Sequence, residues 1–333
     1  MEKNIIDINI INDKASSYFL DDSVNIMELD DSIILVNNVN YAYKKKLSSG
    51  AYGVVYLFTD TNTFEDHVVK IGLDKDSERA VNAEIKIHSI LSAFQNTYLK
   101  DFVFKKRKNF YPKVAPNIIN IFHNQNTDMK AIMMEKYDGD IYSTLVNLDP
   151  ENNDDIKLLV EFLFQISCQL RLLQKYFDFM HNDLKATNIF YKLIDKSKGI
   201  KFDNIRFVMG DFGGSTITFN KFVTKGDVRG SEVDFNPNKD LFMVVHLIIT
   251  FINPLNRSKL ISFFSRFFKE IDTNISINDN DIWHNIYTYN NYPDEYNPKN
   301  FLQRLGELYP EYRPSREQQT NTINLSKKYK IYY

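Results

Sequence analysis

The feature that most constrains the fold is a change in sequence pattern near residues 136–140. Before it, short β-branched and aromatic runs predict strands over 54–58, 67–71, 118–122 and 130–135. Between the second and third of these strands a helix is predicted over 77–94, with Ser77 as its N-cap. After it, helices dominate: a long amphipathic one without Gly or Pro over 158–179, then 241–252, 257–271 and 300–308, with short strands only over 189–193 and 205–209. The chain is therefore predicted to be α+β, with a sheet-rich first half and a larger helical second half.

Composition excludes several classes of protein. The 333 residues carry 41 Lys+Arg against 43 Asp+Glu, a net charge of −2, which argues against a general nucleic-acid binder. The single cysteine, Cys168, excludes an internal disulfide. The apolar run over 241–252 is far short of the roughly 20 residues that span a bilayer, so we expect a buried core helix and no membrane span. Without an apolar signal-peptide core at the N-terminus, a cytoplasmic location is expected.

The ends of the chain differ from its middle. Residues 1–42 are acidic, with eight Asp and Glu against Lys3 and Lys14, and are expected to form a loosely packed extension in which 32–39 could add a strand. We therefore divide the chain into this extension, a sheet-rich part over 43–137, a helical part over 138–316 and a tail over 317–333.

The residues most suited to chemistry follow the long helix and a later strand. The segment His181–Asn188 reads HNDLKATN, and Gly210–Gly213 reads GDFG. A carboxylate and an amide on loops at strand ends, as in Asn188 and Asp211, are the hard oxygen ligands that Mg²⁺ prefers alongside phosphate oxygens. A further acid kept off the metal could deprotonate a hydroxyl nucleophile, and a nearby lysine could offset charge on a transferred phosphoryl group.

These two segments resemble the catalytic loop, H-R-D-L-K-x-x-N, and the metal-binding D-F-G of eukaryotic-type protein kinases. The resemblance extends over roughly 43–316 and implies a bilobal fold, with a small β-rich lobe over 43–137 and a larger helical lobe over 138–316. It also implies ATP and Mg²⁺ as cofactors. By resemblance, Asp183 is the catalytic base, Lys185 contacts the γ-phosphate, and Asn188 and Asp211 hold Mg²⁺.

Upstream segments agree with the same family. The stretch over 47–55 resembles its glycine-rich loop, with Ser48 in place of the first glycine; the residues that would surround the phosphates are Leu47, Ser48, Ser49, Gly50, Ala51, Tyr52 and Gly53. Lys70 lies where the family places the lysine that contacts the α- and β-phosphates. Glu84, in the helix that follows, is its expected partner, and Glu78 is a rival.

The adenine site is assigned by position along the chain. Residues 133–140 resemble the hinge, with Met134 as the gatekeeper and Glu135 and Tyr137 at hinge positions. Val55, Val68 and Phe190 would enclose the adenine ring.

Several residues mark departures or further matches. Asn182 replaces the arginine that usually receives an activation-loop phosphate, so we expect an enzyme that needs no such phosphorylation. Asp240 resembles the aspartate that anchors the catalytic loop, and 195–203 is expected to be a hairpin insertion. The segment 230–232 could stand in for the family's A-P-E, with Arg313 as the partner of Glu232.

Taken together, the residues favour a serine/threonine protein kinase acting on protein substrates. Two alternatives stay open: a pseudokinase that serves as a scaffold, and a small-molecule kinase of the choline or aminoglycoside type. The intact Lys70, Asp183, Asn188 and Asp211 argue against the first alternative. The glycine-rich loop and Lys185 argue against the second. The Asn-, Ile- and Lys-rich composition resembles that of kinases of large DNA viruses, for which the host cytoplasm or the virion would be the location.

Overall fold

The computed structural model describes a chain whose first part is built on one antiparallel sheet. The described residues are 8–18, 33–36, 39–50, 53–72, 75–99, 113–124, 129–145, 147–219, 222–225, 234–269, 271 and 292–313. The sheet has the order β1-β2-β3-β4-β6-β5, and its strands are β1 (Ile33–Val36), β2 (Val39–Gly50), β3 (Gly53–Asp60), β4 (Asp66–Ile71), β5 (Ile118–Asn124) and β6 (Met129–Glu135). Two helices accompany it, α1 (Ile8–Ser16) and α2 (Lys75–Phe94), the second ending in a π-helical turn, Gln95–Leu99.

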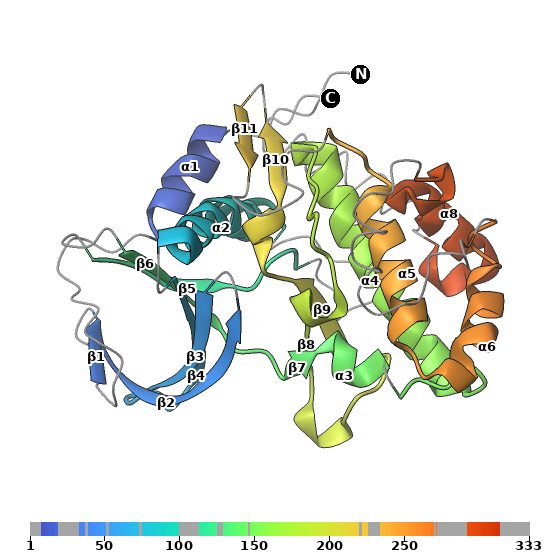
Figure 1. Ribbon diagram of the computed structural model, residues 1–333, viewed down its shortest axis with the longest axis horizontal. Helices are drawn as coiled ribbons and strands as arrows, with labels where there is room; N and C mark the ends of the chain where they lie inside the picture. The colour runs from blue at the N-terminus through green and yellow to red at the C-terminus, as the bar shows by residue number, and fades with distance from the viewer. Residues whose placement is uncertain are drawn as a thin grey trace.

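The second part is mostly helical (Figure 1). Its helices are α3 (Ile141–Leu145), α4 (Asn153–Phe177), α5 (Lys239–Phe251), α6 (Pro254–Phe264) and α8 (Pro298–Leu308). Its strands form a small sheet, β7 (Gly139–Asp140), β8 (Ile189–Leu193) and β9 (Ile205–Met209), and a separate hairpin, β10 (Thr216–Phe219) and β11 (Phe222–Lys225). The predicted α+β class is confirmed. None of the described helices is long and apolar enough to cross a membrane.

The register of the large sheet decides which side chains share a face. Val55 lies opposite Lys70 across β3 and β4, and Lys70 lies opposite Ile132 across β4 and β6. Successive strand residues alternate between faces, so Val68 and Met134, also opposite each other, lie on the same face as Lys70. Helix α2 packs on this face, because its Val81 and Ile85 form one buried cluster with Ile132.

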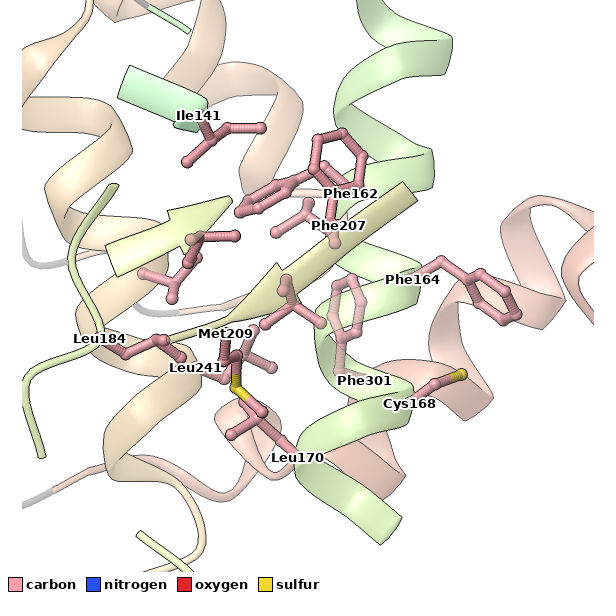
Figure 2. Close-up of a cluster of buried hydrophobic side chains, with 14 of the residues drawn as sticks. Ile141, Phe162, Phe164, Cys168, Leu170, Leu184, Phe207, Met209, Leu241 and Phe301 are labelled. Carbon is pink, nitrogen blue, oxygen red and sulfur yellow. The ribbon is translucent and has the colours of Figure 1, made fainter. Parts of the chain in front are cut away.

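The largest core surrounds α4, and it fixes the loops that carry the site. Figure 2 shows side chains from α4, such as Phe162 and Leu170, meeting Phe207 and Met209 of β9 and Leu184 of the 181–188 loop. All five are at most 1% exposed. Burying a side chain of this size contributes about 1.5–3 kcal/mol. Met209, two residues before Asp211, and Leu184, immediately after Asp183, are therefore held within the main core.

Helix ends account for two differences from the predicted bounds. Helix α4 begins after Asn152, whose side chain accepts hydrogen bonds from the N–H groups of Asp154 and Asp155. It ends at Phe177 instead of 179 because Asp178 takes the left-handed conformation, with φ 43°. The prediction that Ser77 is an N-cap is wrong, since α2 already begins at Lys75. The helix predicted over 257–271 lies earlier, as α6, and ends at Phe264.

The acidic extension is not loosely packed throughout. Helix α1 lies against α2 in Figure 1, and its Ile11 is completely buried in the same core as Ile87 and Leu91 of α2. The Tyr18 carbonyl accepts a hydrogen bond from the Ile121 N–H, and the Tyr18 hydroxyl accepts one from Asn96. The expectation of loose packing, which was based on charge alone, is wrong for this segment because α1 has an apolar face with Ile11 and Ala15. The strand expected within 32–39 is present as β1.

The docking of α1 can be tested by a matched pair of substitutions. Ile11→Ala should lower the free energy of unfolding by about 2–5 kcal/mol, the usual cost of emptying a buried isoleucine site. Ile10→Ala, at a neighbouring side chain that is 48% exposed, should change it by less than about 0.5 kcal/mol. Chemical denaturation measures both, and equal effects would mean that α1 is not part of the folded core.

Candidate active site

A buried lysine joins the sheet to α2 and to the loop after β9. The ammonium of Lys70, on β4, lies 2.5 Å from Glu84 Oε2 of α2 and 2.7 Å from Asp211 Oδ1. The Lys70 and Glu84 side chains are 10% and 2% exposed, whereas that of Asp211 is 34% exposed. The predicted pairing of Lys70 with Glu84, and not with Glu78, is confirmed. The second contact, with Asp211, brings the two predicted phosphate- and metal-binding residues together.

The three charges shift one another's protonation. Burial opposes the charged form of Lys70, but Glu84 and Asp211 outweigh it and raise its pKa above the ordinary range. Burial also opposes ionisation of Asp211, but the Lys70 ammonium outweighs this effect, so the pKa of Asp211 is lowered. Burial raises the pKa of Glu84 despite the same neighbour. A charged lysine therefore remains beside an ionised Asp211, the state required for binding a metal and phosphate.

The 181–188 loop is anchored from α5. The two carboxylate oxygens of Asp240 accept hydrogen bonds from the N–H groups of His181 and Asn182, at 2.8 and 3.0 Å. Asn182 has φ 64°, a left-handed conformation that asparagine tolerates better than most residues. The predicted anchoring role of Asp240 is confirmed, and it fixes the backbone immediately before Asp183.

Asp183 stands at the centre of a second polar group. Lys185 Nζ donates to Asp183 Oδ2 at 2.9 Å, and Asn188 Nδ2 donates to the same oxygen at 3.0 Å. Asn188 Nδ2 also donates to the Asp183 carbonyl at 2.9 Å. The predicted base, the predicted phosphate-contacting lysine and one predicted metal ligand are thus in direct contact.

The Asp211 loop is held from below by aromatic rings. Phe212 is fully buried between His181 and His88, with ring centroids 5.4 and 5.1 Å away. His181 Nε2 makes a 3.0 Å hydrogen bond with the Gly210 carbonyl. Burial lowers the pKa of His88 to about 4, so this ring is neutral at pH 7 and serves as a core residue. Asp211 itself is left-handed, with φ 60°, which turns its carboxylate toward Lys70.

The residues present are compatible with Mg²⁺ bound together with phosphate. Among the described residues, no group of three or more His, Cys, Asp or Glu could hold a metal alone. Asn188 uses its amide nitrogen toward Asp183, so its oxygen is left to face a ligand. Asp211 offers a partly exposed carboxylate. One carboxylate and one amide oxygen suit a magnesium ion whose remaining ligands come from phosphate and water.

The predicted glycine-rich loop comprises the end of β2 and the start of β3, with two residues between them. Gly50 pairs with Gly53, Ser49 with Val54 and Ser48 with Val55, and Leu47 and both serines are exposed. Gly53 has φ 126°, and a Cβ there would lie 2.6 Å from the Ile71 carbonyl oxygen, so only glycine fits. Gly53 is two residues before Val55, which lies opposite Lys70, so this end of β3 is close to the group formed by Lys70, Glu84 and Asp211. Ala51 and Tyr52 lie outside the described residues.

The predicted adenine-site residues fall into two groups. Val68 and Met134 are opposite each other on the face that carries Lys70, and both are half-buried. Tyr137 and Phe190 have ring centroids 6.0 Å apart, and Phe190 lies so close to Gly210 that a Cβ there would meet its ring at 2.4 Å. Gly210 therefore connects this aromatic pair to the Asp211 loop.

The side chain of Glu135 has partners that the sequence did not reveal. Its carboxylate pairs with Lys113 and accepts hydrogen bonds from the Asn117 N–H at 2.7 Å and the Tyr137 hydroxyl at 2.8 Å. The Glu135 carboxylate is therefore bonded to neighbouring protein groups, which gives it a structural role in addition to the predicted ligand-binding one. No motif marks Lys113, because its place beside Glu135 depends on how the chain enters β5.

Two predictions for the later segments have different outcomes. The expected hairpin over 195–203 is confirmed, since β8 and β9 are antiparallel neighbours and 195–203 connects them. The expected pair of Arg313 with Glu232 involves the segment 230–232, which lies outside the described residues.

Comparison with models of known protein families gives no match, and comparison with curated proteins gives none either. The functional argument therefore depends on the residues of the site and on their geometry.

The charge balance of Lys70, Glu84 and Asp211 predicts that removing the lysine makes the stability of the fold depend on pH. In Lys70→Met, Glu84 and Asp211 lose their cation, so their pKa values in the folded state should rise above the unfolded values of about 4. Stability that is full below pH 4 should then be lost as pH rises through the folded-state pKa values, by up to about 1.4 kcal/mol per pH unit for each proton.

Denaturation measured between about pH 5 and 8 tests this expectation against the wild type. Adding Glu84→Gln to Lys70→Met removes one of the two carboxylates and should flatten the slope. An equal pH dependence in all three proteins would contradict the charge assignment.

Proposed function

We propose that the protein is an ATP- and Mg²⁺-dependent serine/threonine protein kinase with a bilobal kinase-like fold. The observation that carries the proposal is the convergence of Lys70, Asp211, Asp183 and Asn188, which come from three separate segments of the chain. The Gly210 N–H, next to Asp211, donates to the Asn188 carbonyl at 2.9 Å and joins the two loops. Phosphoryl transfer needs this combination of positioning and charge stabilisation, with little covalent participation by the protein. The part over 43–137, which contains most of the large sheet, and the mostly helical part over 138–316 would be the two lobes.

Each of the four residues has a distinct part in this reaction. Asp183 accepts the proton of the substrate hydroxyl while the hydroxyl oxygen forms a bond to the γ-phosphorus. The bond between the γ-phosphorus and the bridging oxygen of the β-phosphate breaks at the same time, and ADP leaves. Lys185, 2.9 Å from Asp183, offsets charge on the transferred group. Asp211 and Asn188 would hold Mg²⁺, which when bound would offset negative charge on the phosphates. Lys70 orients the α- and β-phosphates and is itself fixed by Glu84.

A transfer assay tests the proposal. Wild-type protein with γ-labelled ATP and Mg²⁺ should label serine or threonine in a protein acceptor. Asp183→Asn should reduce the rate at least about 100-fold, roughly 2.7 kcal/mol of barrier, because the proton acceptor is lost. Asp203→Asn, an exposed aspartate in the β8–β9 connection, is the control and should retain the rate.

Other outcomes of the same assay identify the alternatives. Label transferred to choline or an aminoglycoside instead of protein would indicate a small-molecule kinase. Nucleotide binding without transfer would indicate a scaffold. Either result would overturn the proposed function.

The structure also bears on the expected independence from phosphorylation. Asn182 is uncharged and fully buried, and its side chain already bonds to the Gly214 carbonyl. Of the hydroxyl residues in the following segment, Ser215 and Thr216 are buried and so are poor acceptors of phosphate. Phosphatase-treated protein, and a Thr218→Ala/Thr224→Ala variant, should keep the wild-type rate within a few-fold. A loss of about 100-fold on phosphatase treatment would show that a loop phosphate is required after all.

A further inference from the structure

An unusual buried lysine lies beneath the 181–188 loop. Lys239 is the first residue of α5 and is only 1% exposed. Its ammonium donates a 2.9 Å hydrogen bond to the side-chain oxygen of Asn182. Among the residues that the structure describes, no carboxylate forms an ion pair with it. The carboxylate of the adjacent Asp240 is turned to the backbone of the loop, where it accepts from His181 and Asn182.

Local forces do not favour a lysine at this position. Burial of an ammonium without a paired carboxylate is costly, and a positive charge in the first turn opposes the helix dipole. Burial lowers the pKa of Lys239, and the proximity of Asp240 offsets this only in part. A neutral residue would therefore suit the helix and the core better, and what the lysine side chain adds is its hydrogen bond to Asn182.

The lysine sets the orientation of the Asn182 amide. Because Asn182 Oδ1 accepts from Lys239, Nδ2 must point to the other side, where it donates to the Gly214 carbonyl at 3.0 Å and to Thr216 Oγ1 at 3.2 Å. Thr216 is further joined to Met180 by two backbone hydrogen bonds, at 2.8 and 3.0 Å. One continuous chain of bonds thus runs from α5 through Asn182 to the segment that follows Asp211.

We propose that Lys239 is a positioning residue for phosphoryl transfer: through Asn182 it holds the Asp183 loop and the segment after Asp211 in one fixed arrangement. This role rests on the proposed function. Lys239 contacts neither Asp183 nor Asp211 by any hydrogen bond or ion pair among the described residues, so it acts on them only through the bonds of Asn182. Because the cation is a side chain of the protein itself, the hydrogen bonds from Lys239 through Asn182 to Gly214 and Thr216 form without phosphorylation.

Lys239→Met tests the proposal, with Lys299→Met as its control. Both lysines lie in the first turn of a helix, but Lys299 is exposed, whereas Lys239 is buried. Lys239→Met should lower kcat at least tenfold with the KM for ATP changed less than threefold, because alignment of the two loops is lost while nucleotide contacts remain. Hydrogen exchange at the amides of 214–216 should become faster. Lys299→Met should change neither quantity.

A second variant separates positioning from folding. Asn182→Asp keeps an acceptor for Lys239, now as a buried ion pair, but removes the two donors to Gly214 and Thr216. We expect its exchange at 214–216 to be accelerated and its kcat to be lowered, while the new ion pair with Lys239 offsets part of the loss in melting temperature. A double-mutant cycle of Asn182→Ala with Lys239→Met should show losses in kcat that do not add, since both break the same chain of bonds.

Exchange at 214–216 does not depend on turnover, so the two proposals can fail separately. Wild-type protein without transfer activity, but with accelerated exchange in Lys239→Met, would refute the proposed function and keep the structural link. Unchanged kcat and unchanged exchange in Lys239→Met would refute the role of Lys239. A loss of kcat that follows only the fall in melting temperature, with exchange at 214–216 unchanged, would also refute it.

Discussion

The ammonium of Lys70 is the interaction on which the rest of the site depends. It is bonded at once to Glu84 of α2 and to Asp211 after β9, so one buried charge joins three elements that are distant in sequence. A buried ion pair is a poor source of net stability, because desolvation offsets most of its Coulomb energy. What it provides here is a fixed geometry, since losing Lys70 would leave two neighbouring carboxylates without their cation.

Hydrophobic packing supplies the rigidity that this geometry requires. Leu184 follows Asp183 and Met209 lies two residues before Asp211, and both enter the core beside α4 (Figure 2). The Asp240 carboxylate then fixes the backbone of His181 and Asn182. Two left-handed residues, Asn182 and Asp211, are maintained by these contacts, and strained backbone of this kind is commonly found where side chains must be presented for function.

The sequence predicted most elements because their patterns are local. Strands β8 and β9 and the long helix α4 follow from periodicity. The pairing of Lys70 with Glu84 was expected from a family resemblance, and the structure contains this ion pair. Contacts between residues that are distant in the sequence could not be predicted from it. No local signal places Lys113 beside Glu135 or Lys239 beneath Asn182, and the apolar stripe of α1 was obscured by neighbouring acids.

The most direct test of this account is a calorimetric titration with a non-hydrolysable ATP analogue, with and without Mg²⁺. If Asp211 and Asn188 hold a metal shared with phosphate, the wild type should bind the analogue more tightly with Mg²⁺, and Asp211→Asn should lose that gain while still binding the metal-free analogue. Wild-type affinity that does not respond to Mg²⁺, or an Asp211→Asn protein that responds as the wild type does, would contradict the assignment of this site to phosphoryl transfer.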